Sequence, residues 1–213
     1  MVELRVDYSA CVVAGTALRD SINAARMYYS ELCEEYFDSL LAKPVKPGGG
    51  FTESACAFLL LDGLLQKNGV ERSGLVISRD PEGRPRIINR TDIDFSISHS
   101  EGAAFCCLAV GENASVGADI QRVRNYSREY MEQLARTFMS KSQLESFLIC
   151  SDRERFFYTA WTEREAVYKR CGVYPGLTAE NDGTPAQGIT RRGIITACGS
   201  RYHYCISLPE TAE

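Results

Sequence analysis

The apolar residues of this chain follow two different periods, and the change between them limits the fold classes that are open. Leu4, Val6 and Tyr8 alternate with polar residues, and an apolar run follows at 11–13, so the chain is expected to open with one or two short strands. Over 18–40 the apolar residues instead recur every three or four positions. That spacing predicts one long amphipathic helix with its aromatic stripe in the core, ending before Pro44. A chain with both periods has to pack helices against sheet.

The same mixture continues to the end of the chain. A loop rich in Pro and Gly at 43–50 precedes a second predicted helix, which has Thr52 as its N-cap and stops at Asn68-Gly69. Beyond it we expect several short strands over 75–110, a hinge at 111–115, a strand at 116–120, helices near 128–138, 141–149 and 153–171, and a closing hairpin turned at Gly199-Ser200. Two of those helix starts carry capping-box spacing, Ser140 with Gln143 and Ser151 with Glu154.

Composition excludes several broad classes. With 45% hydrophobic residues the 213-residue chain can bury a sizeable core, and disorder is not expected. A balance of 24 basic against 28 acidic residues argues against a general polyanion binder, so no nucleic-acid partner is predicted. No window approaches the run of about 18 apolar residues that a membrane span needs, and the start does not read as a signal peptide, so we expect a cytoplasmic protein with no membrane partner. The nine cysteines, an odd number without CxxC pairs, are interpreted mostly as buried reduced thiols.

Polar residues at four places in the chain stand out against this background. On a helix, Trp161, Glu165 and Lys169 share one face, which places a carboxylate one turn from an ammonium; alone this favours a surface ion pair, although the Trp indicates a packed face. Asp119 ends the strand 116–120, where it either caps a turn or projects into a cleft, and with Glu165 it would suffice for Mg2+.

Ser98 and His99 end an apolar strand, where a hydroxyl and an imidazole can donate to a phosphate. A serine hydrolase is excluded, because adjacent strand residues point to opposite faces and no nucleophile-elbow pattern surrounds the serine. Arg84 lies in a turn, where it is either solvated or pairs with phosphate in two directions at once.

Three separated blocks, FSISHS at 95–100, VGADIQ at 116–121 and WTEREAVYK at 161–169, together and in this order resemble the 4'-phosphopantetheinyl transferases of the Sfp type. The resemblance runs from about residue 83 to 172. It implies an α+β fold of two similar α/β halves with pseudo-twofold symmetry and the active site in the cleft between them. The predicted hinge agrees with halves at 1–112 and 113–213, the second carrying the metal and catalytic residues. Because one chain would then supply the whole cleft, we expect a monomer.

The resemblance also implies an activity. Such an enzyme transfers the 4'-phosphopantetheine moiety of coenzyme A to a serine of an acyl- or peptidyl-carrier protein. Asp119 and Glu165 match the positions that bind Mg2+ with the pyrophosphate of coenzyme A, Glu165 would accept the serine proton, and Lys169 would stabilise the departing phosphate. Gln121 stands at the second acidic position of the family; it either ligates Mg2+ through its carbonyl or a water, or leaves the metal and holds the incoming nucleophile.

For coenzyme A itself, the resemblance assigns Ser98 and His99 to the 3'-phosphate. Arg84, in the sequence Gly-Arg-Pro where the family carries Gly-Lys-Pro, is assigned to a phosphate contact. Arg164 stands where the family has lysine and is expected to point away from the Glu165 face. Further basic contacts from the first half are not evident in the sequence. Two other functions stay open, a degenerate member that binds coenzyme A or a carrier protein without transfer, and a metal-dependent phosphohydrolase.

Overall fold

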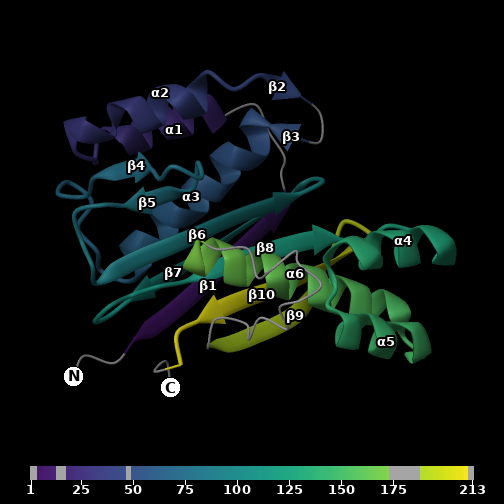
Figure 1. Ribbon diagram of the computed structural model, residues 1–213. Coiled ribbons are helices and arrows are strands. Elements are labelled where there is room, and N and C mark those ends of the chain that lie inside the picture. Colours follow the sequence, from purple (N-terminus) through teal and green to yellow (C-terminus); the bar gives the residue numbers. More distant parts are fainter. Residues whose placement is uncertain (1–3, 13–17, 47–48, 173–187, 211–213) are drawn as a thin grey trace.

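Two three-stranded antiparallel sheets form the centre of the molecule (Figure 1). The structure, a computed structural model, describes residues 4–12, 18–46, 49–172 and 188–210. The first sheet has the order β1-β7-β6, with β1 at Arg5–Val12, β6 at Ile93–Ser100 and β7 at Ala103–Val110. The second has the order β8-β10-β9, with β8 at Gly117–Arg122, β9 at Ile189–Ala197 and β10 at Ser200–Leu208. Two short hairpins complete the strands: β2 (Val45–Lys46) with β3 (Gly49–Gly50), and β4 (Ile77–Arg79) with β5 (Pro85–Ile87).

The two sheets meet where β6 lies beside β8, and side chains rather than backbone carbonyls join them (Figure 1). Every second side chain of β6 accepts a backbone N–H from β8 or from the residue before it. The four bonds are Val116 N to Asp94 at 2.8 Å, Ala118 N to Ser96 at 2.9 Å, Ile120 N to Ser98 at 3.4 Å and Arg122 N to Ser100 at 3.0 Å. Because both partners advance by two residues at each step, the strands run parallel, and short side chains with an acceptor oxygen are required at these β6 positions.

Helices cover the first sheet on one face. The long helix α3 (Phe51–Lys67) packs on β7, β6 and β1, and α1 (Leu18–Arg26), the 3-10 helix η1 (Glu31–Cys33) and α2 (Glu34–Leu41) lie outside it (Figure 1). The core between them contains Phe37, Phe58 and Phe95, each at most 1% exposed. Burial of such large aromatic side chains stabilises this layer by roughly 2–3 kcal/mol for each.

The helix α6 (Arg153–Cys171) lies against β8 and β10 of the second sheet, and α4 (Arg128–Phe138) and α5 (Lys141–Ile149) pack beside it (Figure 1). A separate apolar cluster joins the three helices around Phe147 and Phe157. Helices and strands therefore occur on both sides of the β6–β8 junction, which confirms the predicted α+β class. Among the described helices, none combines the length and the apolar composition needed to cross a bilayer.

The single long helix predicted over 18–40 is wrong. Instead, the chain leaves the helical path after Arg26, and Ser30 adopts an extended conformation and caps η1 through its side chain. The spacing of three and four persists because α1 and α2 both direct apolar residues into the same core. Tyr29 and Tyr36 are buried as expected, whereas Leu32 falls at the break and is 74% exposed.

Several predicted helix caps and the predicted hairpin turn differ from the structure by one or two residues. The second helix begins at Phe51 after Gly50, so Thr52 is not its N-cap, and Asp152 rather than Ser151 caps α6 by accepting from Arg155 N. The capping box of Ser140 and Gln143 is confirmed. The closing hairpin turns at 198–199, where both residues have positive φ, one position earlier than expected. All nine cysteines lie in the described ranges and are free; five are buried and one, Cys198, is exposed.

Candidate active site at the junction of the two sheets

One residue from each of the three sequence blocks meets the other two at a single point. Ser98 of β6 donates its hydroxyl proton to Asp119 Oδ1 at 2.7 Å. Lys169 of α6 donates from Nζ to Asp119 Oδ1 at 2.8 Å and to Ser98 Oγ at 2.9 Å. Asp119 is 2% exposed, so the Lys169 ammonium supplies the counter-charge that a buried carboxylate requires. The structure thus brings together residues that lie up to 71 positions apart.

Gly117 allows α6 to approach β8 closely enough for these contacts. A Cβ atom at Gly117 would lie 1.9 Å from the carbonyl oxygen of Ala166 and 2.5 Å from the backbone nitrogen of Arg170. Only glycine leaves room for this approach. Arg170, the α6 residue next to Gly117, is the chain neighbour of Lys169, so the same approach brings Lys169 to the site.

Gln121 lies beside Asp119 on the same face of β8. Its Nε2 donates to Asp119 Oδ2 at 3.2 Å, and its Oε1 accepts from the Ser100 hydroxyl at 3.4 Å. Both oxygens of Asp119 therefore have donors, Oδ1 from Ser98 and Lys169 and Oδ2 from Gln121.

The donor set here consists of hard oxygen atoms. Asp119 and Gln121 are adjacent, and Glu165 is half-buried on α6 one turn before Lys169. Within the described ranges no three His, Cys, Asp or Glu side chains are grouped closely enough to form a complete metal cage. Two carboxylates and an amide oxygen nevertheless fit Mg2+, which takes one or two carboxylates and completes its shell with water and substrate phosphates.

The face of α6 that carries this site is packed and is not a solvated surface. Trp161 lies edge-on to Phe138, with ring centroids 4.9 Å apart, and also contacts Phe157. Arg164 donates to the carbonyl oxygen of Phe138, the last residue of α4. The alternative of an ordinary surface ion pair at Glu165 and Lys169 loses its support, because Lys169 pairs with Asp119.

His99 belongs to a second polar group beside Ser98. Its Nδ1 lies 2.9 Å from Oε2 of Glu53, a carboxylate that is only 3% exposed. Burial lowers the pKa of His99 from its usual value; Glu53 opposes this shift, and the like charges of Lys169 and Lys43 add to it. Lys43 follows α2 and donates to the Ser54 hydroxyl at 2.9 Å.

Sequence reasoning missed both Glu53 and Lys43. Glu53 lies in the first turn of α3 and Lys43 in the segment rich in Pro and Gly, and neither position carries a motif that connects it to His99. Lys43 is a basic residue of the first half near His99, where the sequence had shown no further basic contact.

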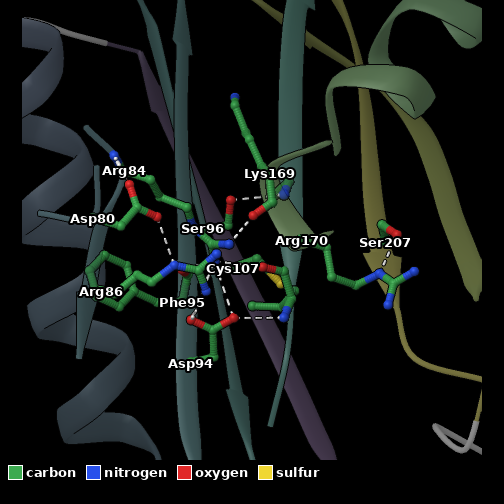
Figure 2. A network of polar contacts seen from close by, with 12 residues as sticks. Asp80, Arg84, Arg86, Asp94, Phe95, Ser96, Cys107, Lys169, Arg170 and Ser207 are labelled. Carbon is green, nitrogen blue, oxygen red and sulfur yellow. Dashed lines mark hydrogen bonds and ion pairs between the residues drawn. The ribbon is translucent and has the colours of Figure 1, made fainter. Parts of the chain in front are cut away.

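Arg84 extends across the junction of the two sheets (Figure 2). Its guanidinium donates to the Asp94 carboxylate at 3.1 and 3.3 Å, to the carbonyl oxygens of Phe95 at 2.6 Å and Val116 at 2.7 Å, and to the carbonyl oxygen of Lys169. The side chain is 11% exposed. Burial lowers the pKa of Arg84, and Asp94 opposes that shift. These N–H groups are therefore engaged by the protein, and a contact of Arg84 with a coenzyme A phosphate stays a prediction.

A pocket of about 160 Å³ opens beside Gln121. Aromatic side chains form much of its wall, and Arg122 and Arg124 are among its lining residues. The lining residues are Glu101, Gln121, Arg122, Arg124, Tyr126, Leu134, Phe157, Tyr158 and Trp161. The buried indole N–H of Trp161 has no hydrogen-bond partner among the residues that the structure describes.

The fold and the site together define a class of protein. It is an α+β protein that carries a buried aspartate, a lysine and a polar strand end at the junction of two sheets. The family model of the 4'-phosphopantetheinyl transferase superfamily matches residues 115–204. A curated relative, 4'-phosphopantetheinyl transferase Sfp of Bacillus subtilis (strain 168), is 28% identical over 106 residues, which cover 48% of this chain and 44% of the relative. The chain thus spans less than half of that relative's length in the match. The resemblance to the superfamily, and to its Sfp type, is confirmed.

Proposed function

We propose that this protein transfers the 4'-phosphopantetheine moiety of coenzyme A to a serine of an acyl- or peptidyl-carrier protein. The observation that carries the proposal is the contact of Ser98, Asp119 and Lys169 within 2.9 Å of one another. Each of the three belongs to a different sequence block that resembles the Sfp type. An unrelated fold with the same three patterns by chance would have no reason to bring them together.

In the proposed reaction, the carrier serine oxygen forms a bond to the β-phosphorus of coenzyme A. The bond from that phosphorus to the oxygen bridging it to the α-phosphate breaks, and 3',5'-bisphosphoadenosine leaves. Glu165 accepts the serine proton, directly or through water. Lys169, whose Nζ lies 2.8 Å from Asp119, would provide the positive charge for the departing phosphate.

Asp119 and Glu165 would hold Mg2+, with Gln121 beside them. When bound, the ion supplies charge neutralisation for the pyrophosphate oxygens. Gln121 is neutral, and its carbonyl oxygen accepts one hydrogen bond, from Ser100, which leaves a second lone pair for the metal. Its position at the pocket of about 160 Å³ equally suits a role in holding the serine or the pantetheine arm.

His99, with Ser98 and Lys43 beside it, would receive the 3'-phosphate. Lys43 and Lys169 both act on His99 electrostatically, so an anion bound there meets three basic groups. Arg122 and Arg124, which line the pocket, would contact an acidic carrier protein. We propose further that residues 1–112 and 113–213 are the two halves of a pseudo-twofold fold with the substrates bound between them. In support, each three-stranded sheet takes its strands from one half only. The protein would act as a cytoplasmic monomer.

The test is intact-mass spectrometry of an apo carrier protein after incubation with this protein, coenzyme A and Mg2+. Glu165→Gln should abolish the mass gain of one phosphopantetheine. Glu163→Gln is the matched control, because Glu163 lies on the same helix but pairs with Arg192 at 3.3 Å on another face. Free phosphopantetheine without a modified carrier would instead indicate a phosphohydrolase.

A second candidate is a degenerate member that binds coenzyme A or the carrier without transfer. The observation in its favour is that Lys169 and Gln121 already donate to both oxygens of Asp119. Coenzyme A binding that is independent of Mg2+, with no modification of several carriers, would support this candidate over the transferase.

A further inference from the structure

Glu53 is a buried carboxylate that none of the three sequence blocks contains. It is the third residue of α3 after the N-cap Gly50, and it is 3% exposed. Both of its oxygens are engaged: Oε2 lies 2.9 Å from His99 Nδ1, and Oε1 accepts from Gly102 N at 2.7 Å. The positive end of a helix dipole favours an anion in the first turn.

The Glu53 contact determines how the imidazole of His99 can act. A carboxylate only accepts, so the ring nitrogen that faces it, Nδ1, has to carry a hydrogen atom. Nε2 is then the nitrogen left for a ligand, and the His99 side chain is 44% exposed. Glu53 is itself anchored to the turn between β6 and β7, where Glu101 and Gly102 have φ of 37° and 87°. The imidazole is therefore fixed by a rigid hairpin turn and a helix start.

The charges around His99 show why a carboxylate is needed. Lys43 approaches from the segment after α2 and Lys169 from α6, and both cations, together with burial, disfavour the imidazolium. Glu53 of α3 is the group that favours it. A neutral ring held through Nδ1–H would present a bare Nε2 to a phosphate, which repels an anion. A doubly protonated ring presents an N–H to each side.

We propose that Glu53 is a positioning residue for His99: it holds the imidazole through Nδ1–H, so that Nε2 faces the 3'-phosphate of coenzyme A and takes up a proton when that phosphate binds. The ligand in this inference rests on the proposed function. The role of Glu53 does not require the transfer reaction, because it concerns binding alone. Neither the family match, which begins at residue 115, nor the sequence pattern includes Glu53.

The experiment uses the imidazole signals of the whole protein, since the chain has only two histidines, His99 and His203. Nitrogen-15 NMR titrations of the wild type and of Glu53→Gln report the protonation state and tautomer of each ring. Glutamine keeps an oxygen for Gly102 N but removes the charge, so the His99 pKa should fall in the variant. His203, on β10, is the internal control and should not change.

Calorimetric titration with coenzyme A and with dephospho-coenzyme A, which lacks the 3'-phosphate, then tests the ligand. Wild-type protein should prefer coenzyme A, and Glu53→Gln should lose about tenfold in affinity for coenzyme A and nothing for dephospho-coenzyme A. His99→Gln should show the same loss, and the double variant should lose no more than either one. Should Glu53→Gln fail to fold, the wild-type spectrum still decides, since neutral His99 must carry its hydrogen on Nδ1.

Each outcome is decisive. A neutral His99 protonated on Nε2, or an unchanged preference for coenzyme A in Glu53→Gln, overturns the inference and leaves phosphopantetheinyl transfer intact. A lost preference in that variant, together with no mass gain on any carrier protein, upholds the inference and refutes the transfer.

Discussion

Replacing Gly117 by alanine is expected to separate Lys169 from Asp119. The new Cβ atom would lie 1.9 Å from the backbone oxygen of Ala166, whereas side-chain Cβ atoms essentially never come closer than 3.0 Å. The obstacle is the backbone of α6, so no side-chain rotation relieves it. The helix has to move away from the strand by about 1 Å or more.

That displacement has two consequences of different size. Overpacking of this kind costs about 2 kcal/mol, which for a chain of this length lowers the Tm by about 4–8 °C. The contact of Lys169 Nζ with Asp119 Oδ1, 2.8 Å long, would lengthen beyond hydrogen-bonding distance. A misplacement of about 1 Å at a reacting centre lowers a rate by about 100-fold, so transfer should suffer far more than folding.

Calorimetric melting and the carrier mass assay measure the two effects on the same preparation. The matched control is Gly63→Ala, on an exposed position of α3 where an added Cβ meets nothing within 4 Å. The control should be stabilised by up to about 1 kcal/mol, because alanine is the better helix former, and should keep its rate. Wild-type melting and wild-type transfer in Gly117→Ala would refute the close approach of α6 and β8.

Three further outcomes are expected. Lys169→Met removes the counter-charge of Asp119 and should lower the free energy of unfolding, measured by urea denaturation, by about 2–3 kcal/mol. It should also lower turnover more than it lowers the affinity for coenzyme A. Unchanged stability would contradict the ion pair. Ser98→Ala should slow transfer, whereas Ser96→Ala, which loses only its bond to β8, should keep the rate; equal rates in single-turnover assays would remove Ser98 from the site. His203 is 4% exposed and burial lowers its pKa, so the unfolded chain binds the extra proton and stability falls as the pH drops below 6.5. The variant His203→Phe should flatten the dependence of Tm on pH in that range. An unaltered slope would show that another group causes the effect.

Predictions that depend on local pattern agree best with the structure. The capping box at Ser140 and the helices α4, α5 and α6 follow from spacings within a few residues. The one long helix over 18–40 failed because apolar periodicity does not reveal a break when both pieces pack on the same core. Ser30, which caps η1, is the local signal that could have located that break.

The residues of the candidate site also divide into those that the sequence predicted and those that only the structure showed. Ser98, Asp119 and Lys169 were identified from the blocks that carry them, and the structure places them in contact. Glu53 could not be found, because an acidic residue in the first turn of a helix is common and its partner is 46 positions away. Arg84 was noticed as a basic residue in a turn, but its burial against Asp94 depends on how the two sheets meet.

By itself the sequence determined the α+β class, most helices and strands, and the three blocks whose order resembles one superfamily, because each of these depends on residue type and short spacing. Only the tertiary structure decided that alternate side chains of β6 replace backbone acceptors for β8, that Gly117 sets the distance to α6, and that Glu53 faces His99. Those features depend on distances between segments far apart in the chain, and such distances are set by packing rather than by local preference.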